Sequence, residues 1–204
     1  MSILYIHLPF CNNKCPYCDF FSVPRVSPDI KDRYTDSLIL EFEHRKAELG
    51  DKLKTMYLGG GSPVLLGSNN LIKLSKHIKD NFKHIEEITI EVNPEQIGDI
   101  NVFLELMLNL GVNRVSIGVQ TTNQSILNLI KRQLDEQKIK ETIKLLRHNG
   151  IDTSIDMMFG LPSQSIKDLD TDLDYVTECR PEHISFYMFT VAPVYEYFSI
   201  CPSE

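Results

Sequence analysis

The chain has 204 residues, of which 42% are hydrophobic and 24% charged, and its formal net charge at pH 7 is −7. This composition is typical of one globular domain with a sizeable core, and an acidic chain without long basic runs argues against nucleic acid as the main partner. No apolar run reaches the about 20 residues that a membrane span needs. Pro9 and Cys11 interrupt any signal-peptide pattern early, so we expect a cytoplasmic protein.

Strand-like and helix-like segments alternate along the chain. We expect strands at 3–8, 55–58, 88–92, 115–119, 151–159 and 183–190, and helices from Pro28 to about Gly50 and at 70–82, 100–110, 124–130, 136–148 and 165–178. This alternation predicts right-handed βαβ units and a parallel sheet. Six strands fit either an open doubly wound sheet or a partial barrel, and the pattern alone does not decide between the two.

In either architecture the loops at the carboxyl ends of the strands carry the site. Chemically active side chains and glycines follow or end each predicted strand, so one edge of the sheet collects them. In chain order they are Cys11–Cys18, Gly59–Pro63, Glu91, Gln120, Asp156 and Tyr187.

Three cysteines, Cys11, Cys15 and Cys18, occupy eight residues after the first strand. In a chain without an export pattern, clustered cysteines predict metal ligands rather than disulfides. Structural zinc would need a fourth ligand, and a redox pair of Cys15 and Cys18 would leave Cys11 unexplained. Iron–sulfur clusters are normally held by four cysteines, so a [4Fe–4S] cluster here would leave one iron open to a small chelating ligand. We rank the open cluster ahead of zinc.

Two carboxylates lie late in parallel strands, where apolar residues usually dominate. Glu91 and Asp156 each need a partner if they are buried, such as a ligand hydroxyl, an ammonium group or an arginine. An internal ion pair with Arg114 or Arg132 is the alternative for either residue alone. Their shared edge with the cysteines favours a ligand, and the nearby glycine run Gly59–Gly61 would let that ligand approach the backbone.

The C-x3-C-x2-C loop after a first strand resembles the signature of the radical S-adenosylmethionine (SAM) enzymes. Further segments make the resemblance specific to one group of these enzymes, namely 5–11, 18–20, 59–63, 91–94, 114–120, 156–162 and 183–187. Together they resemble the oxygen-independent coproporphyrinogen III oxidase group, and most closely its HemW-type haem chaperone branch, over nearly all of residues 1–190.

The resemblance implies an α/β fold: a partial (β/α)6 barrel that lacks the last helix and the C-terminal domain. Residues 1–190 would be the radical SAM core, and 191–204 an irregular tail. Cys11, Cys15 and Cys18 would hold a [4Fe–4S] cluster, and SAM would chelate the open iron. One electron would then cleave a C–S bond of SAM to leave a 5′-deoxyadenosyl radical. The residues matched to the SAM pocket are Tyr5, Tyr17, Gly60, Gly61, Ser62, Glu91, Gln120, Arg132 and Asp156.

The resemblance further implies haem as a ligand, a haem-acceptor protein and an external electron donor. Phe20 stands where the catalytic oxidases carry a fourth cysteine, so coproporphyrinogen oxidase activity is the less favoured alternative, and SAM cleavage stays open. The branch's Arg-x-His pattern is here Arg132-Gln133-Leu134, and its acidic-glycine turn is replaced at 191–194. Because the haem-associated HNxxYW motif lies outside this chain, a fragment that keeps the fold without function is a third hypothesis.

Overall fold

The computed structural model describes residues 2–50 and 53–190. Its main element is a six-stranded sheet in which every neighbouring pair is parallel. The strands are β1 (Ser2–Leu8), β4 (Leu53–Gly60), β5 (Glu87–Val92), β6 (Arg114–Gln120), β7 (Asp152–Phe159) and β8 (His183–Met188). A separate parallel pair of two-residue strands, β2 (Phe10–Cys11) and β3 (Val23–Pro24), carries the first cysteine.

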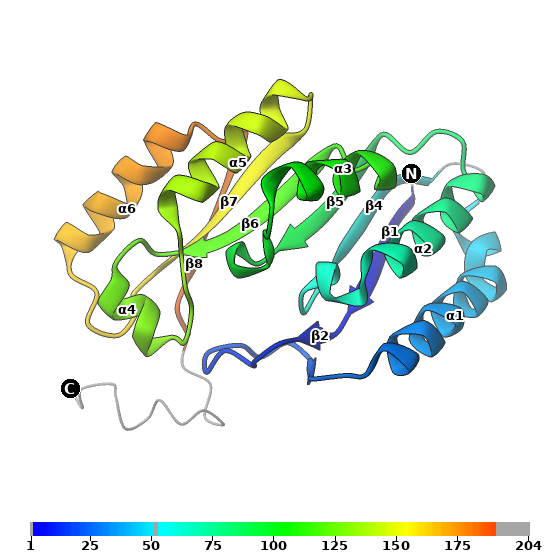
Figure 1. Ribbon diagram of the computed structural model, residues 1–204, viewed down its shortest axis with the longest axis horizontal. Helices are drawn as coiled ribbons and strands as arrows, with labels where there is room; N and C mark the ends of the chain where they lie inside the picture. Colours follow the sequence, from blue (N-terminus) through cyan, green and yellow to red (C-terminus); the bar gives the residue numbers. More distant parts are fainter. Residues whose placement is uncertain (1, 51–52, 191–204) are drawn as a thin grey trace.

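The order of the strands distinguishes the two predicted architectures. The sheet runs β1-β4-β5-β6-β7-β8, so each strand is added beside the preceding one and β1 lies at an edge. A doubly wound sheet would place its first strand in the interior, with strands added on both sides. In Figure 1 the blue β1 and the orange-red β8 lie at opposite ends of the sheet. The fold is therefore an open, partial α/β barrel.

Four of the α-helices begin where short polar side chains satisfy free backbone N–H groups. The side chains of Asp99, Asn123, Asp135 and Ser165 each accept such a bond at the start of a helix. The α-helices are α1 (Pro28–Arg45), α2 (Ser68–Asn81), α3 (Ile100–Leu110), α4 (Gln124–Leu129), α5 (Glu136–His148) and α6 (Ile166–Cys179). Short 3₁₀ helices are η1 (Lys46–Leu49), η2 (Pro63–Leu66) and η3 (Pro94–Gln96).

The core lies between the sheet and the helices. Along a strand, successive side chains point to opposite faces. One face of the sheet presents apolar side chains such as Met56 and Ile90, which are buried in one cluster with Ile78 of α2 and Met107 of α3. The other face carries polar side chains toward the inside of the partial barrel, and it is this face that leads to the cysteine loop.

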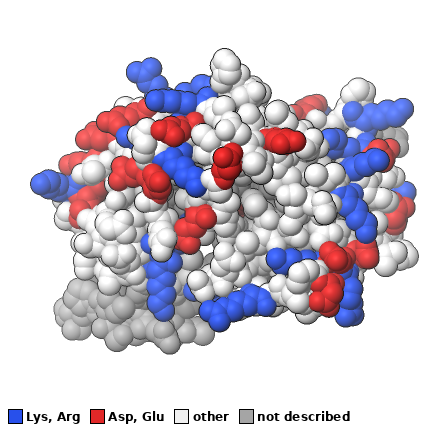
Figure 2. All heavy atoms as spheres, viewed as in Figure 1, with Lys and Arg blue, Asp and Glu red and all other residues white. Residues whose placement is uncertain are grey.

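Charged side chains cover the outside of the molecule. On the face shown in Figure 2, Lys and Arg are interspersed with Asp and Glu and no large patch has a single sign. In the part of the chain that the structure describes, no helix combines the length and the apolar character that crossing a membrane requires.

The predicted strands and helices are present, with shifted ends. The strand predicted at 55–58 extends over Leu53–Gly60, while the predicted helix 136–148 has the same bounds as α5. The two-residue strands β2 and β3 were missed because so short a run has no periodicity to read. Residues 191–204 lie outside the described residues, and a domain boundary at 190 stays a prediction.

A buried carboxylate joins α6 to the loop that follows β6. Asp172 is fully buried, and its oxygens accept hydrogen bonds from Thr121 Oγ1 (2.9 Å), Thr122 N (2.6 Å), Thr122 Oγ1 (2.7 Å) and Gln164 Nε2 (3.3 Å). These donors replace the water that a carboxylate loses on burial. This loop directly follows Gln120. Asp172 therefore anchors the carboxyl end of β6, and with it Gln120, to α6.

Asp172→Asn is expected to lower the free energy of unfolding by about 1–3 kcal/mol, because the new amide group would face hydroxyl and amide donors that it cannot satisfy. Urea unfolding followed by circular dichroism would measure the change. Asp174→Asn, an exposed change on the same helix, is the control and is expected to stay within about 0.5 kcal/mol of the unmodified chain. Equal losses in both variants would contradict this role for Asp172.

Candidate functional site

A cavity of about 390 Å³ opens at the carboxyl ends of the strands. Its walls come from the cysteine loop, the loop after β4, and the ends of β5, β6 and β7. The predicted site residues that line it are Cys11, Cys15, Tyr17, Cys18, Gly60, Gly61, Ser62, Glu91, Gln120, Arg132 and Asp156. Residues far apart in sequence therefore meet at one edge of the sheet.

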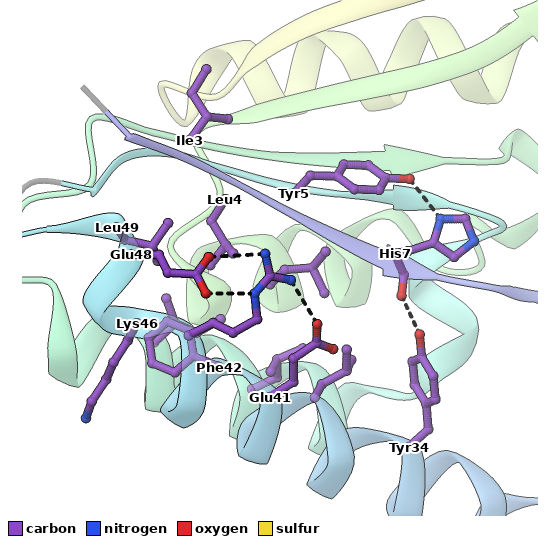
Figure 3. A pocket seen from close by; sticks show the side chains of 15 residues that line it. Ile3, Leu4, Tyr5, His7, Tyr34, Glu41, Phe42, Lys46, Glu48 and Leu49 are labelled. Carbon is purple, nitrogen blue, oxygen red and sulfur yellow. Dashed lines mark hydrogen bonds and ion pairs between the residues drawn. The ribbon is translucent and has the colours of Figure 1, made fainter.

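Tyr5 is the predicted site residue that does not line this cavity. It borders a groove of about 340 Å³ between β1 and α1, shown in Figure 3. Its hydroxyl lies 3.0 Å from Nδ1 of His7, whose backbone carbonyl in turn accepts a bond from Tyr34 on α1. The side chain of Tyr5 is about half exposed. Its assignment to a cofactor stays a prediction that the cavity does not support directly.

The three cysteines are presented by a loop that is tied down at both ends. The amide of Cys18 donates to the carbonyl of Cys15 (3.0 Å), and the carbonyl of Cys11 accepts from Arg25 N (3.3 Å). All three thiols are half-buried. Burial, followed by the proximity of the other thiols, raises the pKa of Cys11 and of Cys18. A positively charged centre between them would favour the thiolate forms that bind metals.

The arrangement bears on the kind of metal centre. Among residues 2–50 and 53–190, no three His, Cys, Asp or Glu side chains converge closely enough to hold a single metal ion. Structural zinc normally takes four protein ligands, whereas this loop offers three thiols, all half-buried and lining one cavity. Three cysteine ligands with one iron left open fit a [4Fe–4S] cluster.

The glycine run lies directly against the backbone that leads into the cysteine loop. The amide of Gly61 donates to the carbonyl of Leu8 (2.9 Å), and a Cβ at Gly61 would lie 2.7 Å from the carbonyl oxygen of Phe10. Gly60 has φ of +110°, and a Cβ there would lie 2.5 Å from the ring of His7. Only glycine permits this approach, so the run brings its own backbone next to the thiols.

The two carboxylates have different partners. Glu91 is held on both oxygens, by the hydroxyl of Tyr57 (2.8 Å) and the amide of Gly60 (2.9 Å). Asp156 accepts one bond, from Ser116 Oγ to Oδ2 (2.8 Å), and its buried Oδ1 has no hydrogen-bond partner. Asp156 also lines the cavity, and a buried carboxylate oxygen without a partner is costly, so this carboxylate has the capacity to accept a hydroxyl or an ammonium group from a ligand.

The internal ion pairs that the sequence left open do not form within the described ranges. Arg114 pairs instead with Glu87, at 3.4 Å from Nη1 to Oε1. The guanidinium of Arg132 donates to the carbonyl of Gly118 (2.6 Å). Neither Glu91 nor Asp156 has a cationic partner in that part of the chain, so both stay available to the cavity.

Three further predicted residues shape the walls. Tyr17 packs against a small apolar cluster that includes Met158, and burial is the main cause of its raised pKa. Gln120 has φ of +73°, an uncommon conformation for a side chain other than glycine. Ser62 is buried and its hydroxyl donates to the side chain of Gln96.

Two residues beside the site were missed at the level of sequence. His7 contacts the carbonyl oxygen of Phe21 through Nε2 (2.9 Å), and because a carbonyl only accepts, Nε2 carries the proton and Nδ1 faces the hydroxyl of Tyr5. Tyr57 donates to Glu91. The alternation along the strands could have revealed both, since Tyr5, His7 and Tyr57 share the inner face of the sheet.

The fold is an open parallel α/β barrel whose carboxyl end carries three half-buried thiols and a close-packed glycine run. These features define a class of proteins that is suited to hold a cysteine-ligated cluster beside a small ligand. The family model of the radical SAM superfamily matches residues 5–176. The chain therefore belongs to the radical SAM superfamily.

The similar proteins include haem chaperones and an oxidase. The chain is 36% identical over 193 residues to "Heme chaperone HemW" of Buchnera aphidicola subsp. Schizaphis graminum, covering 93% of this chain and 51% of that protein. It is 32% identical to the oxygen-independent coproporphyrinogen III oxidase of Salmonella typhimurium, covering 93% and 42%. The structure of coproporphyrinogen III oxidase (HemN) from Escherichia coli matches with a TM-score of 0.84 at 31% identity, covering 94% and 45%. The chain spans about half the length of the curated HemW proteins it matches.

Gly60→Ala is expected to destabilise the protein by about 1–3 kcal/mol, because its φ of +110° is unfavourable for alanine and the new methyl would meet the His7 ring. Thermal or urea unfolding would show the loss. Gly98→Ala is the matched control, since a Cβ at Gly98 meets no atom within 4 Å. If the two variants were equally stable, the contact between Gly60 and His7 would not constrain the fold.

Proposed function

We propose that this chain binds a [4Fe–4S] cluster through Cys11, Cys15 and Cys18 and binds SAM at the iron that has no protein ligand. The observation that carries the proposal is that these thiols line one cavity together with Asp156, whose carboxylate keeps one unpartnered oxygen. Three cysteines leave a cluster one ligand short. Membership of the radical SAM superfamily supports this pair of cofactors at the level of the family.

The protein's own groups would bind and orient SAM. Asp156 Oδ1 would accept a hydroxyl or the ammonium group of SAM, which carries both. Gly60 and Gly61 would let SAM lie against the backbone, between Glu91 and the wall formed by Tyr17. The remaining predicted contacts are those of Tyr5, Ser62, Gln120 and Arg132. When bound, the cluster and SAM supply radical chemistry that begins with one-electron cleavage of a C–S bond in SAM.

We further propose that the chain serves haem transfer, in the manner of a HemW-type chaperone that delivers haem to an acceptor protein. The support is its similarity to proteins named HemW, together with Phe20, which the family resemblance places where a cysteine is expected in the oxidases. An external electron donor and a cytoplasmic setting belong to this proposal, since thiols stay reduced there. The activity is proposed from relatives of which this chain spans about half.

The cofactor proposal is tested by anaerobic reconstitution with iron and sulfide. The reduced cluster is expected to give an EPR signal that changes when SAM is added. Asp156→Asn is expected to raise the Kd for SAM about tenfold, or about 1.4 kcal/mol. The substitution replaces one of the two acceptor oxygens of the carboxylate by an NH2 group, which cannot accept a hydrogen bond. Asp152→Asn, an exposed change at the start of the same strand, is the control and should leave the Kd unchanged.

An EPR signal of the reduced cluster that does not change when SAM is added would contradict the proposed SAM site. Failure of the chain to retain iron after reconstitution would contradict the cysteine assignment as well. Equal Kd values for the Asp156 and Asp152 variants would show that the unpartnered oxygen does not contact SAM.

The haem proposal has a separate measurement. Haemin added to the anaerobic protein is expected to give a saturable change in the Soret absorbance, and incubation with coproporphyrinogen III, SAM and dithionite is expected to give no decarboxylated product. No saturable haemin binding would contradict a chaperone role for this chain. Decarboxylated product together with 5′-deoxyadenosine would instead make it an oxidase.

A further inference from the structure

The positively charged side chain of Arg132 lines the cavity that the three cysteines border. Its backbone amide donates to the carbonyl of Leu127 (2.9 Å), which holds the residue just beyond α4. The side chain is partly buried and reaches the cavity wall, where Nη2 donates to the carbonyl of Gly118 (2.6 Å). On its other side, Nη1 lies 3.8 Å from Sγ of Cys15, within the range of an N–H···S contact.

The charge of this guanidinium is not cancelled by a salt bridge. Within residues 2–50 and 53–190, no carboxylate lies within ion-pair distance of Arg132. Glu95 lies nearby, but its Oε1 accepts from the amide of Gln133 (2.9 Å). An arginine side chain stays protonated in proteins, so the positive charge is permanent. The acceptors that face the guanidinium are thus a backbone carbonyl and a cysteine sulfur.

The other two thiols, Cys11 and Cys18, line the same cavity as Arg132. A partly buried charge is less screened by salt and water than an exposed one, so its effect on neighbouring groups is larger. All three predicted cluster ligands therefore experience one fixed positive charge.

We propose that Arg132 sets the reduction potential of the cluster, by donating an N–H group to the Cys15 sulfur and by fixing a positive charge beside all three ligands. The inference rests on the proposed cluster at Cys11, Cys15 and Cys18. Reduction adds one electron to the centre, supplied by an external one-electron donor, and breaks no bond. A fixed cation and a hydrogen bond to a ligand sulfur both stabilise the more negative, reduced form, so Arg132 raises the potential.

This role differs from the SAM contact that the family resemblance implies for Arg132. A SAM contact would change the affinity for SAM and leave the potential of the SAM-free cluster untouched. A contact with Cys15 would change the potential before any SAM is present. The two roles are therefore separated by measuring the cluster alone.

The experiment is an EPR-monitored redox titration of the reconstituted full chain without SAM, with dithionite as the reductant. At a fixed potential, Arg132→Met is expected to shift the ratio of reduced to oxidised cluster at least tenfold toward the oxidised form, which for a one-electron couple is a fall of about 59 mV. Arg132→Lys keeps the charge but cannot supply the planar fork of donors, so an intermediate shift is expected.

The matched control is Lys131→Met. Lys131 is the adjacent residue, lines the same cavity and is exposed, so its charge is screened by water. Its removal is expected to leave the midpoint potential within the error of the titration. This comparison separates a specific contact from a general loss of positive charge around the site.

Each outcome bears on the inference. Equal midpoint potentials for the Arg132→Met, Arg132→Lys and unmodified chains would overturn it, and a weaker affinity for SAM in the same variants would make Arg132 a SAM ligand instead. If Arg132→Met does not assemble a cluster, Arg132→Lys supplies the comparison, and an unshifted potential there overturns the inference. If the unmodified chain assembles no cluster, the proposed function fails first.

Discussion

The site depends on one close contact between two stretches of backbone. The residues after β4 donate to those after β1, from Gly61 N to Leu8 O (2.9 Å) and from Ser62 N to Phe10 O (2.8 Å). This contact tethers the beginning of the cysteine loop to the end of the neighbouring strand. A side chain on Gly61 would separate the two stretches, because its Cβ would lie 2.7 Å from a carbonyl oxygen. The lack of a side chain at Gly61 therefore permits the close backbone contact that positions the cysteine loop.

Around that contact, charged side chains of both signs line one cavity. Arg132 lies against the sulfur of Cys15, and Glu91 and Asp156 line the same cavity from the ends of β5 and β7. Glu91 is satisfied by protein donors, whereas Asp156 keeps one buried oxygen unpaired. A fold selected for stability alone would pair that oxygen. The unpaired group and the positive φ of Gln120 both support the ligand site proposed at this edge of the sheet.

Much of the fold could be predicted because its signals are local. Helical periodicity was sufficient to predict α5, and the alternation of strands and helices was sufficient to predict parallel pairing. The site residues were predictable to the extent that they end strands, since parallel strands carry their carboxyl ends to one edge. Tyr5 lies in mid-strand, where its ring contacts that of Tyr57 on the inner face of the sheet, and it does not line the cavity. Its position away from the strand end is what distinguishes it from the other predicted site residues.

The sequence by itself determined the type of fold, the cysteine loop and the set of residues at the strand ends, because strand and helix periods and the spacing of thiols are properties of neighbouring residues. Periodicity alone left a doubly wound sheet and a partial barrel open, and the tertiary structure, whose strand order depends on long-range pairing, confirmed the partial barrel that the family resemblance implied. Only the tertiary structure decided which carboxylate is satisfied, and that Arg132 faces Cys15 across 117 positions of chain. Such contacts join segments whose separation carries no periodic signal, and they exist only once the chain has folded.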